Sequence, residues 1–152
     1  MSKPRIMYYN DGRHSHIYRY EPPMQKEEYL SMVDEVVGTS VEAIMLCLGE
    51  GRTMLHDTKV GELLGHNVDK WNHAIFRRTY QNAKHLINEG NDPLRIICER
   101  AHEKGILLYP NLVMQNGGVD HATVRCSDFR FNNTHLEIGA RGDLDPSFPG
   151  YD

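Results

Sequence analysis

The sequence lacks the features that mark several classes of protein. None of its apolar runs approaches the ~20 residues of a membrane-spanning helix, and the first eleven residues contain no apolar stretch typical of a signal peptide. Positive charge is not in excess either, because the formal net charge is −4 with neutral histidines. Nucleic-acid binding would call for a basic surface. We therefore expect neither a membrane nor a nucleic acid as a partner.

Cysteine is scarce, and its spacing argues against a disulfide framework or a zinc site. Cys47, Cys98 and Cys126 are far apart and odd in number, so they form neither a CxxC pair nor a set of bridges. A reducing cytoplasm is the location that this cysteine usage favours. The Gly-x-Gly-x-x-Gly signature of a dinucleotide-binding fold is also missing after the first predicted strand. We expect no cofactor and no metal.

What the sequence does contain is an alternation of apolar runs and amphipathic stretches. Strands are predicted at residues 6–9, 41–48 and 106–113, and helices at 25–37, 71–89 and 93–104. The strand segments are almost continuously apolar, which is typical of strands buried on both faces of a parallel sheet. The order strand, helix, strand, helices, strand indicates parallel βαβ units and an α/β fold.

The remaining segments show no such pattern. Residues 52–69 are polar and receive no assignment, and residues 118–152 are predicted to be mostly loop with at most one helical turn. The chain fits a single domain spanning 1–152. Three parallel strands cannot close a barrel, so the predicted sheet has apolar open edges. Such edges pair with further chain or with another molecule, and self-association through the open edge is expected.

Five motifs carry a resemblance to a known family. They are Tyr8-Tyr9-Asn10-Asp11-Gly12, Val33-Asp34-Glu35-x-x-Gly38-Thr39, His56-Asp57-Thr58-Lys59-Val60-Gly61-Glu62, Gly90-Asn91-Asp92-Pro93-Leu94 and Ala101-His102-Glu103-Lys104-Gly105. Together they resemble the amino-terminal region of bacterial glycosyl-hydrolase-like (β/α)8-barrel proteins.

The resemblance implies a partial TIM barrel of about three parallel βα units, followed by a long irregular C-terminal segment. It also implies a carbohydrate ligand. The catalytic carboxylates of such hydrolases usually lie on later strands, so this chain is expected to be a truncated relative that is inactive alone. It departs from the family pattern at Val113-Met114-Gln115-Asn116, where relatives carry Arg-Met-Asn-Asp, so no role of that arginine or aspartate is transferred.

Candidate binding residues follow from the rule that functional groups of barrels gather at the C-terminal ends of the strands. Amides and carboxylates suit sugar hydroxyls, which both donate and accept hydrogen bonds. Asp11 and Glu50 are expected to position a substrate, although Asn-Asp-Gly is turn chemistry in its own right. The rule selects Asn10, Asp11, Arg13, His14, Glu50, Gln115, Asn116 and His121.

Two alternatives remain open at this point. His14-Ser15-His16 is the His-x-His pattern that some metal-dependent hydrolase or isomerase barrels place after the first strand. The other alternative is a non-catalytic half-barrel that binds a partner through its open sheet edge.

Overall fold

The computed structural model describes residues 3–17, 19–114 and 124–136 of the chain. Its elements, in order, are β1 (Met7–Asn10), α1 (Arg13–Ile17), α2 (Lys26–Asp34), β2 (Ala43–Glu50), β3 (Thr53–Met54), β4 (Glu62–Leu63), α3 (Ala74–Asn88), α4 (Pro93–Lys104), β5 (Leu107–Val113), α5 (Asp128–Asn132) and the 3-10 helix η1 (Thr134–Leu136).

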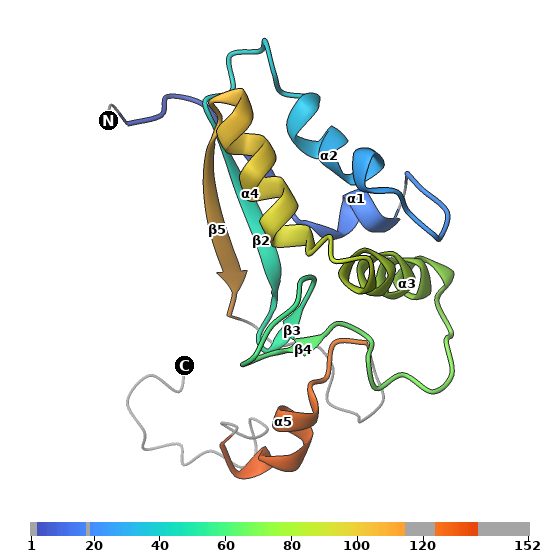
Figure 1. Ribbon diagram of the computed structural model, residues 1–152. Coiled ribbons are helices and arrows are strands. Elements are labelled where there is room, and N and C mark those ends of the chain that lie inside the picture. The colour runs from blue at the N-terminus through green and yellow to red at the C-terminus, as the bar shows by residue number, and fades with distance from the viewer. Residues whose placement is uncertain (1–2, 18, 115–123, 137–152) are drawn as a thin grey trace, which may run out of the picture.

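The sheet is built around β2, and it is mostly parallel. β1 and β5 lie on either side of β2 and run parallel to it, with Met7 opposite Ala43 and Ala43 opposite Leu107 (Figure 1). The short β3 pairs antiparallel with the end of β2, and β4 pairs parallel with β3. The predicted α/β class and the three long parallel strands are therefore confirmed.

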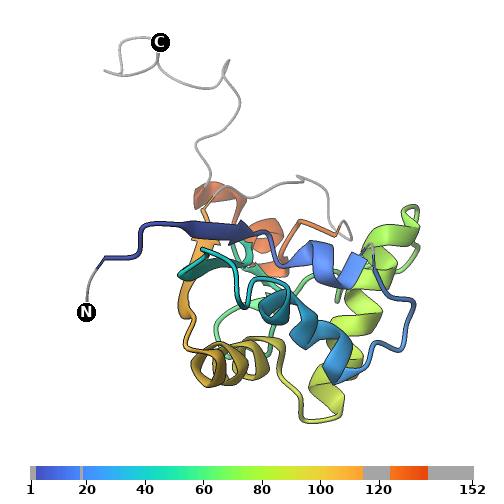
Figure 2. The same ribbon diagram turned by 90° about the horizontal axis from the view of Figure 1, so that it is seen from above.

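Helices α2 and α4 cover one side of this sheet (Figure 2). Gln25 caps the start of α2, and its backbone amide donates to the Glu28 carboxylate at 2.7 Å in a capping box. α4 begins after Asp92 with a proline in its first turn and ends at Gly105, which has φ +70°. These local signals explain why the predicted bounds of α4 match the observed ones.

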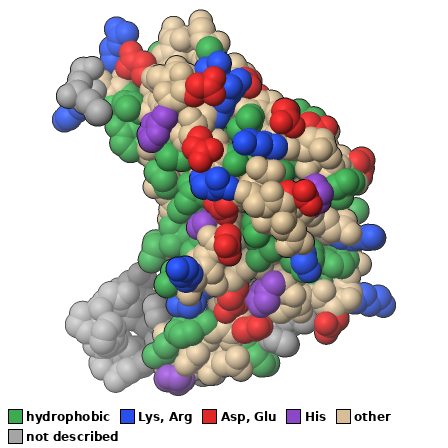
Figure 3. Space-filling model, viewed as in Figure 1, with side chains coloured by type: hydrophobic (Ala, Val, Ile, Leu, Met, Phe, Trp, Pro, Cys, Tyr) green, Lys and Arg blue, Asp and Glu red, His purple; other side chains and the backbone are tan. Residues whose placement is uncertain are grey.

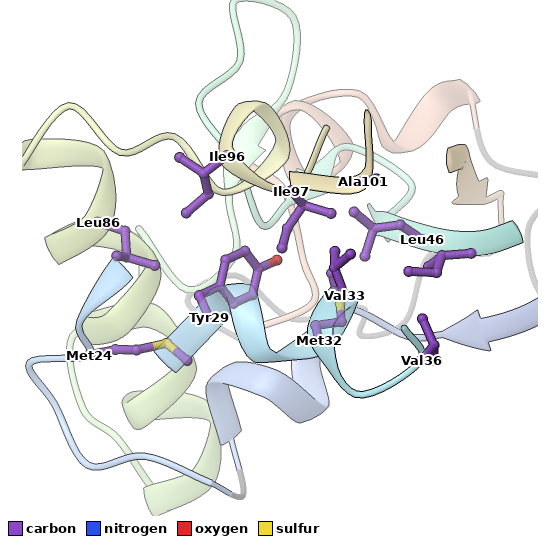
Figure 4. Close-up of a cluster of buried hydrophobic side chains, with 11 residues drawn as sticks. Met24, Tyr29, Met32, Val33, Val36, Leu46, Leu86, Ile96, Ile97 and Ala101 are labelled. Carbon is purple, nitrogen blue, oxygen red and sulfur yellow. The ribbon is translucent and has the colours of Figure 1, made fainter. Parts of the chain in front are cut away.

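The hydrophobic core lies between these two helices, α3 and the covered face of β2. Burying such side chains stabilises the fold by roughly 1.5–3 kcal/mol each. Figure 4 shows the cluster, which comprises Met24, Tyr29, Met32, Val33, Val36, Ile44, Leu46, Leu86, Ile96, Ile97 and Ala101.

The opposite side of the sheet is open in the described part of the chain. Met7, Tyr9 and Tyr109 point to this side and are exposed, and Tyr9 and Tyr109 flank Met45 in the strand register. Hydrophobic side chains also gather along the side of the molecule where β5 lies (Figure 3). The prediction that the first and third strands are buried on both faces is wrong, because no described element packs on this second face.

Three elements were not predicted. α1 falls in a segment that the sequence indicated as loop, and β3 and β4 fall within the unassigned residues 52–69. In the predicted C-terminal loop, residues 124–136 hold α5 and η1, while the rest of 118–152 lies outside the described residues. Over the described ranges, no helix combines the length and the apolar character needed to cross a membrane.

Candidate functional site

After β1 the chain makes a tight turn that packs against β2. The buried Asn10 side chain accepts a hydrogen bond from the backbone amide of Gly12 at 2.8 Å, which closes the turn. Gly12 has φ +72°, and a Cβ atom there would lie 2.5 Å from the carbonyl oxygen of Cys47. Asn10 therefore shapes the turn, and glycine allows the turn to press against the neighbouring strand.

The two carboxylate oxygens of Asp11 make different contacts in this turn. Its Oδ1 accepts a hydrogen bond from the backbone amide of His14 at 3.0 Å, at the beginning of α1. Its Oδ2 lies 3.5 Å from Nε2 of His14 and 3.8 Å from the guanidinium of Arg13. Oδ1 of Asp11 thus accepts from the backbone, and Oδ2 faces the side chains of Arg13 and His14.

Glu50 ends β2 and lies between two guanidinium groups. Its Oε1 is 2.8 Å from Nη1 of Arg13, and its Oε2 is 3.3 Å from Nε of Arg125. The Glu50 side chain is largely buried, and so is that of Arg13. Because Arg13 contacts both carboxylates, it links the end of β1 to the end of β2.

Arg125 is a member of this cluster that sequence reasoning did not connect with Glu50. It lies between β5 and α5, 75 positions after Glu50 by subtraction of the residue numbers. The only signal in the sequence was a charged stretch containing Arg125 and Asp128, which is usually a solvated loop.

Tyr9 borders the cluster on the open side of the sheet. The pKa of the Tyr9 phenol lies above its ordinary value, chiefly because of partial burial and then because of the neighbouring Cys47 thiol. Asp11 adds to this effect, and the positive charge of Arg13 opposes it. The Tyr9 hydroxyl is therefore a neutral donor and acceptor next to the charged groups.

Of the other predicted site residues, His14 lies in this cluster and the rest are not described by the structure. His14 is exposed and contacts Asp11, so Asn10, Asp11, Arg13, His14 and Glu50 do come together. Gln115, Asn116 and His121 lie outside the described residues, and the side chain of His16 does as well. The prediction that His14 and His16 form a metal pair therefore stays a prediction.

A second polar cluster joins β4 to α5. Glu62, His66 and Asp128 each offer one ligand atom, and these three atoms lie within 4.8 Å of one another. The sequence predicts no metal site, and these residues are not among its candidates. The spacing of Glu62 and His66, four positions apart, was the available signal, but Asp128 is distant in the sequence.

Comparison with known proteins leaves the family open. No protein-family model matches the chain. A search among curated proteins also finds no significant match. The resemblance to glycosyl-hydrolase-like barrels rests on the five motifs alone.

Proposed function

We propose that the chain is a carbohydrate-binding unit of glycoside-hydrolase-like barrel type, and that the cluster at the ends of β1 and β2 binds sugar hydroxyls. The observation that carries this proposal is the position of Glu50 between Arg13 and Arg125, with Asp11 on the neighbouring strand end. Carboxylates and guanidiniums fixed in this way offer acceptors and donors to a hydroxyl-rich ligand.

Binding is favoured over hydrolysis at this cluster. A glycosidase needs two carboxyl groups on either side of the scissile bond, ~5–10 Å apart. Here the guanidinium of Arg13 contacts both Asp11 and Glu50. The arginine therefore occupies the space that a scissile bond would need, and the two carboxylates act as positioning groups.

The test is an NMR titration of the full chain with glucose, galactose, mannose and N-acetylglucosamine. We expect at least one sugar to shift the backbone amide signals of Gly12, Glu50 and Gly51, with millimolar affinity. Glu50→Gln should weaken that binding about tenfold or more, because an amide cannot hold both guanidiniums by charge. Glu99→Gln, at an exposed glutamate of α4, should leave it unchanged. Absence of localised shifts with every sugar would reject the proposal.

A second candidate function is self-association, here through the uncovered face of the sheet and not through the open edge that the sequence predicts. The exposed side chains of Met7, Tyr9 and Tyr109 favour it, because contiguous apolar surface of this kind is typical of protein interfaces. Light scattering across a hundredfold range of concentration should show a dimer, and Tyr109→Ser should shift it toward monomer. A monomer at every concentration would exclude this function.

A further inference from the structure

Three metal-ligating side chains meet where β4 contacts α5. Glu62 belongs to β4, His66 follows it by four positions, and Asp128 is the first residue of α5 (Figure 1). The Nε2 atom of His66 lies 3.1 Å from Oδ2 of Asp128 and 3.7 Å from Oε2 of Glu62. Two carboxylates and one imidazole therefore converge on a single point.

Both ring nitrogens of His66 face acceptors. Nδ1 lies 3.0 Å from the carbonyl oxygen of Leu63, and Nε2 lies 3.1 Å from Oδ2 of Asp128. With Nδ1–H donated to the Leu63 carbonyl, Nε2 can hold either a hydrogen that it donates to Asp128 or a metal ion that takes the place of that hydrogen. A histidine that donates one ring N–H to a carbonyl and presents the other nitrogen is the usual arrangement of a metal ligand.

Both carboxylates are oriented by neighbouring groups. Glu62 accepts hydrogen bonds from the backbone amides of Asp128 at 2.7 Å and Phe129 at 3.1 Å. Oδ1 of Asp128 accepts from Nδ2 of Asn67 at 2.9 Å, and the same Nδ2 also donates to the Cys126 carbonyl. Oδ2 of Asp128 is thereby directed at His66. Such supporting contacts hold metal ligands in place.

The spacing and charge of this set suit a small dication. Zn²⁺ binds nitrogen and oxygen at ~2.0–2.2 Å, which puts neighbouring ligand atoms of a tetrahedral site about 3.3 Å apart. The two distances from Nε2, 3.1 and 3.7 Å, bracket that value. Two carboxylates carry more negative charge than one imidazolium could balance, so a dication between them would be favoured.

We propose that Glu62, His66 and Asp128 bind a first-row divalent metal ion, with Zn²⁺ preferred over Mg²⁺. An imidazole ligand selects zinc and its neighbours over magnesium, which favours oxygen-only sites. The side chains are 18%, 31% and 42% exposed, respectively, so the ion has a path from solvent. Three protein ligands leave a fourth position for water or a ligand atom. The bound ion would link α5 to β4 through its ligands Asp128 and Glu62.

Calorimetry of the chelator-treated full chain with ZnCl2 and MgCl2 tests this proposal. We expect one Zn²⁺ per chain at micromolar or tighter affinity, and at least a hundredfold weaker binding of Mg²⁺. His66→Gln and Asp128→Asn should each weaken Zn²⁺ binding tenfold or more. His102→Gln, at an exposed histidine of α4, is the matched control and should leave the affinity unchanged.

A second measurement on the unmutated chain keeps the test independent of folding in the variants. Zn²⁺ should shift the ¹⁵N resonance of Nε2 of His66, while Nδ1 keeps its proton. Zinc that binds with unchanged affinity in both variants, or that shifts the rings of other histidines but not His66, would overturn the proposal. Absence of binding would do the same. None of these outcomes bears on sugar binding at Glu50, which uses other residues.

Discussion

The carboxylate of Asp92 accepts a hydrogen bond from the backbone amide of Asp57 at 2.7 Å, although the two residues lie 35 positions apart. The other oxygen of the same carboxylate accepts from the backbone amide of Arg95 at 2.9 Å and caps α4. Asp92 therefore joins the loop before β4 to the beginning of a core helix. The same carboxylate thus caps a helix and holds a loop that is distant in the sequence.

Asp92→Ala is expected to lower the free energy of unfolding by about 1–2 kcal/mol. The change removes the cap and leaves the backbone amides of Arg95 and Asp57 without this acceptor. Urea denaturation followed by circular dichroism measures the loss. Asp69→Ala, at an exposed aspartate, is the control, and it should change stability by less than ~0.5 kcal/mol. Equal stability of the two variants would disprove the capping role.

Gly12→Ala is expected to destabilise the fold by about 1–2 kcal/mol more than Gly38→Ala. Both glycines have positive φ, +72° and +80°, so alanine is strained at each. A Cβ atom at Gly12 would lie 2.5 Å from the Cys47 carbonyl oxygen, whereas none of the described atoms would lie within 4 Å at Gly38. The pair thus separates the steric clash from the backbone strain. Similar denaturation midpoints would show that the turn relaxes without cost.

Asn82→Ala is expected to cost about 2 kcal/mol of stability. The buried side chain of Asn82 accepts from the Met24 amide at 3.1 Å and donates to the Tyr20 carbonyl at 3.2 Å. Alanine would leave both backbone groups without this partner. Thermal unfolding of Asn82→Ala beside the exposed control Asn88→Ala measures the difference. A loss no larger than that of the control would contradict the role of Asn82.

Glu42 is expected to titrate below the ordinary range of a glutamate. The backbone amide of Arg5 donates to it at 2.7 Å and the Arg5 side chain at 2.9–3.0 Å, and these bonds lower the pKa of the Glu42 carboxyl. Because the pKa is lower in the folded state, the stabilisation is present above the unfolded value. It is lost as the pH falls through the folded value.

A carboxyl-detected NMR titration measures the Glu42 pKa directly. Arg5→Ala should raise it only part of the way, since the backbone amide, whose hydrogen bond is the largest cause of the shift, remains. A wild-type midpoint at or above the ordinary glutamate value would refute the contact. Full recovery in Arg5→Ala would assign the whole shift to the guanidinium.

The parts of the fold that the sequence predicted well are those coded by local signals. Asp92, Pro93 and Gly105 define α4 at both ends, and an apolar run marks β2 within two residues. β3 and β4 have two residues each, so no periodicity exists to reveal them. Pro110 is tolerated within β5 because that strand pairs, among the described strands, with β2 alone.

Burial and long-range contacts were harder to predict. Tyr109 reads as a core residue by its apolar neighbours, but its exposure depends on what covers the sheet, which lies outside its local sequence. In the candidate site, Asp11 and Glu50 were predicted together because strand ends of parallel neighbours meet at one edge. Arg125 approaches Glu50 through a tertiary contact, which no spacing rule reveals.

The central place of β2 has a consequence for the order in which the chain folds. Its parallel pairings join Ala43 to Met7 on one side and to Leu107 on the other, and each pairing closes a long loop. Non-local pairings of this kind slow folding, because the entropy of loop closure is lost before the contacts form. During synthesis the apolar β2 must therefore wait for β5 to leave the ribosome. In that interval the edge of β2 that later pairs with β5 is open to aggregation.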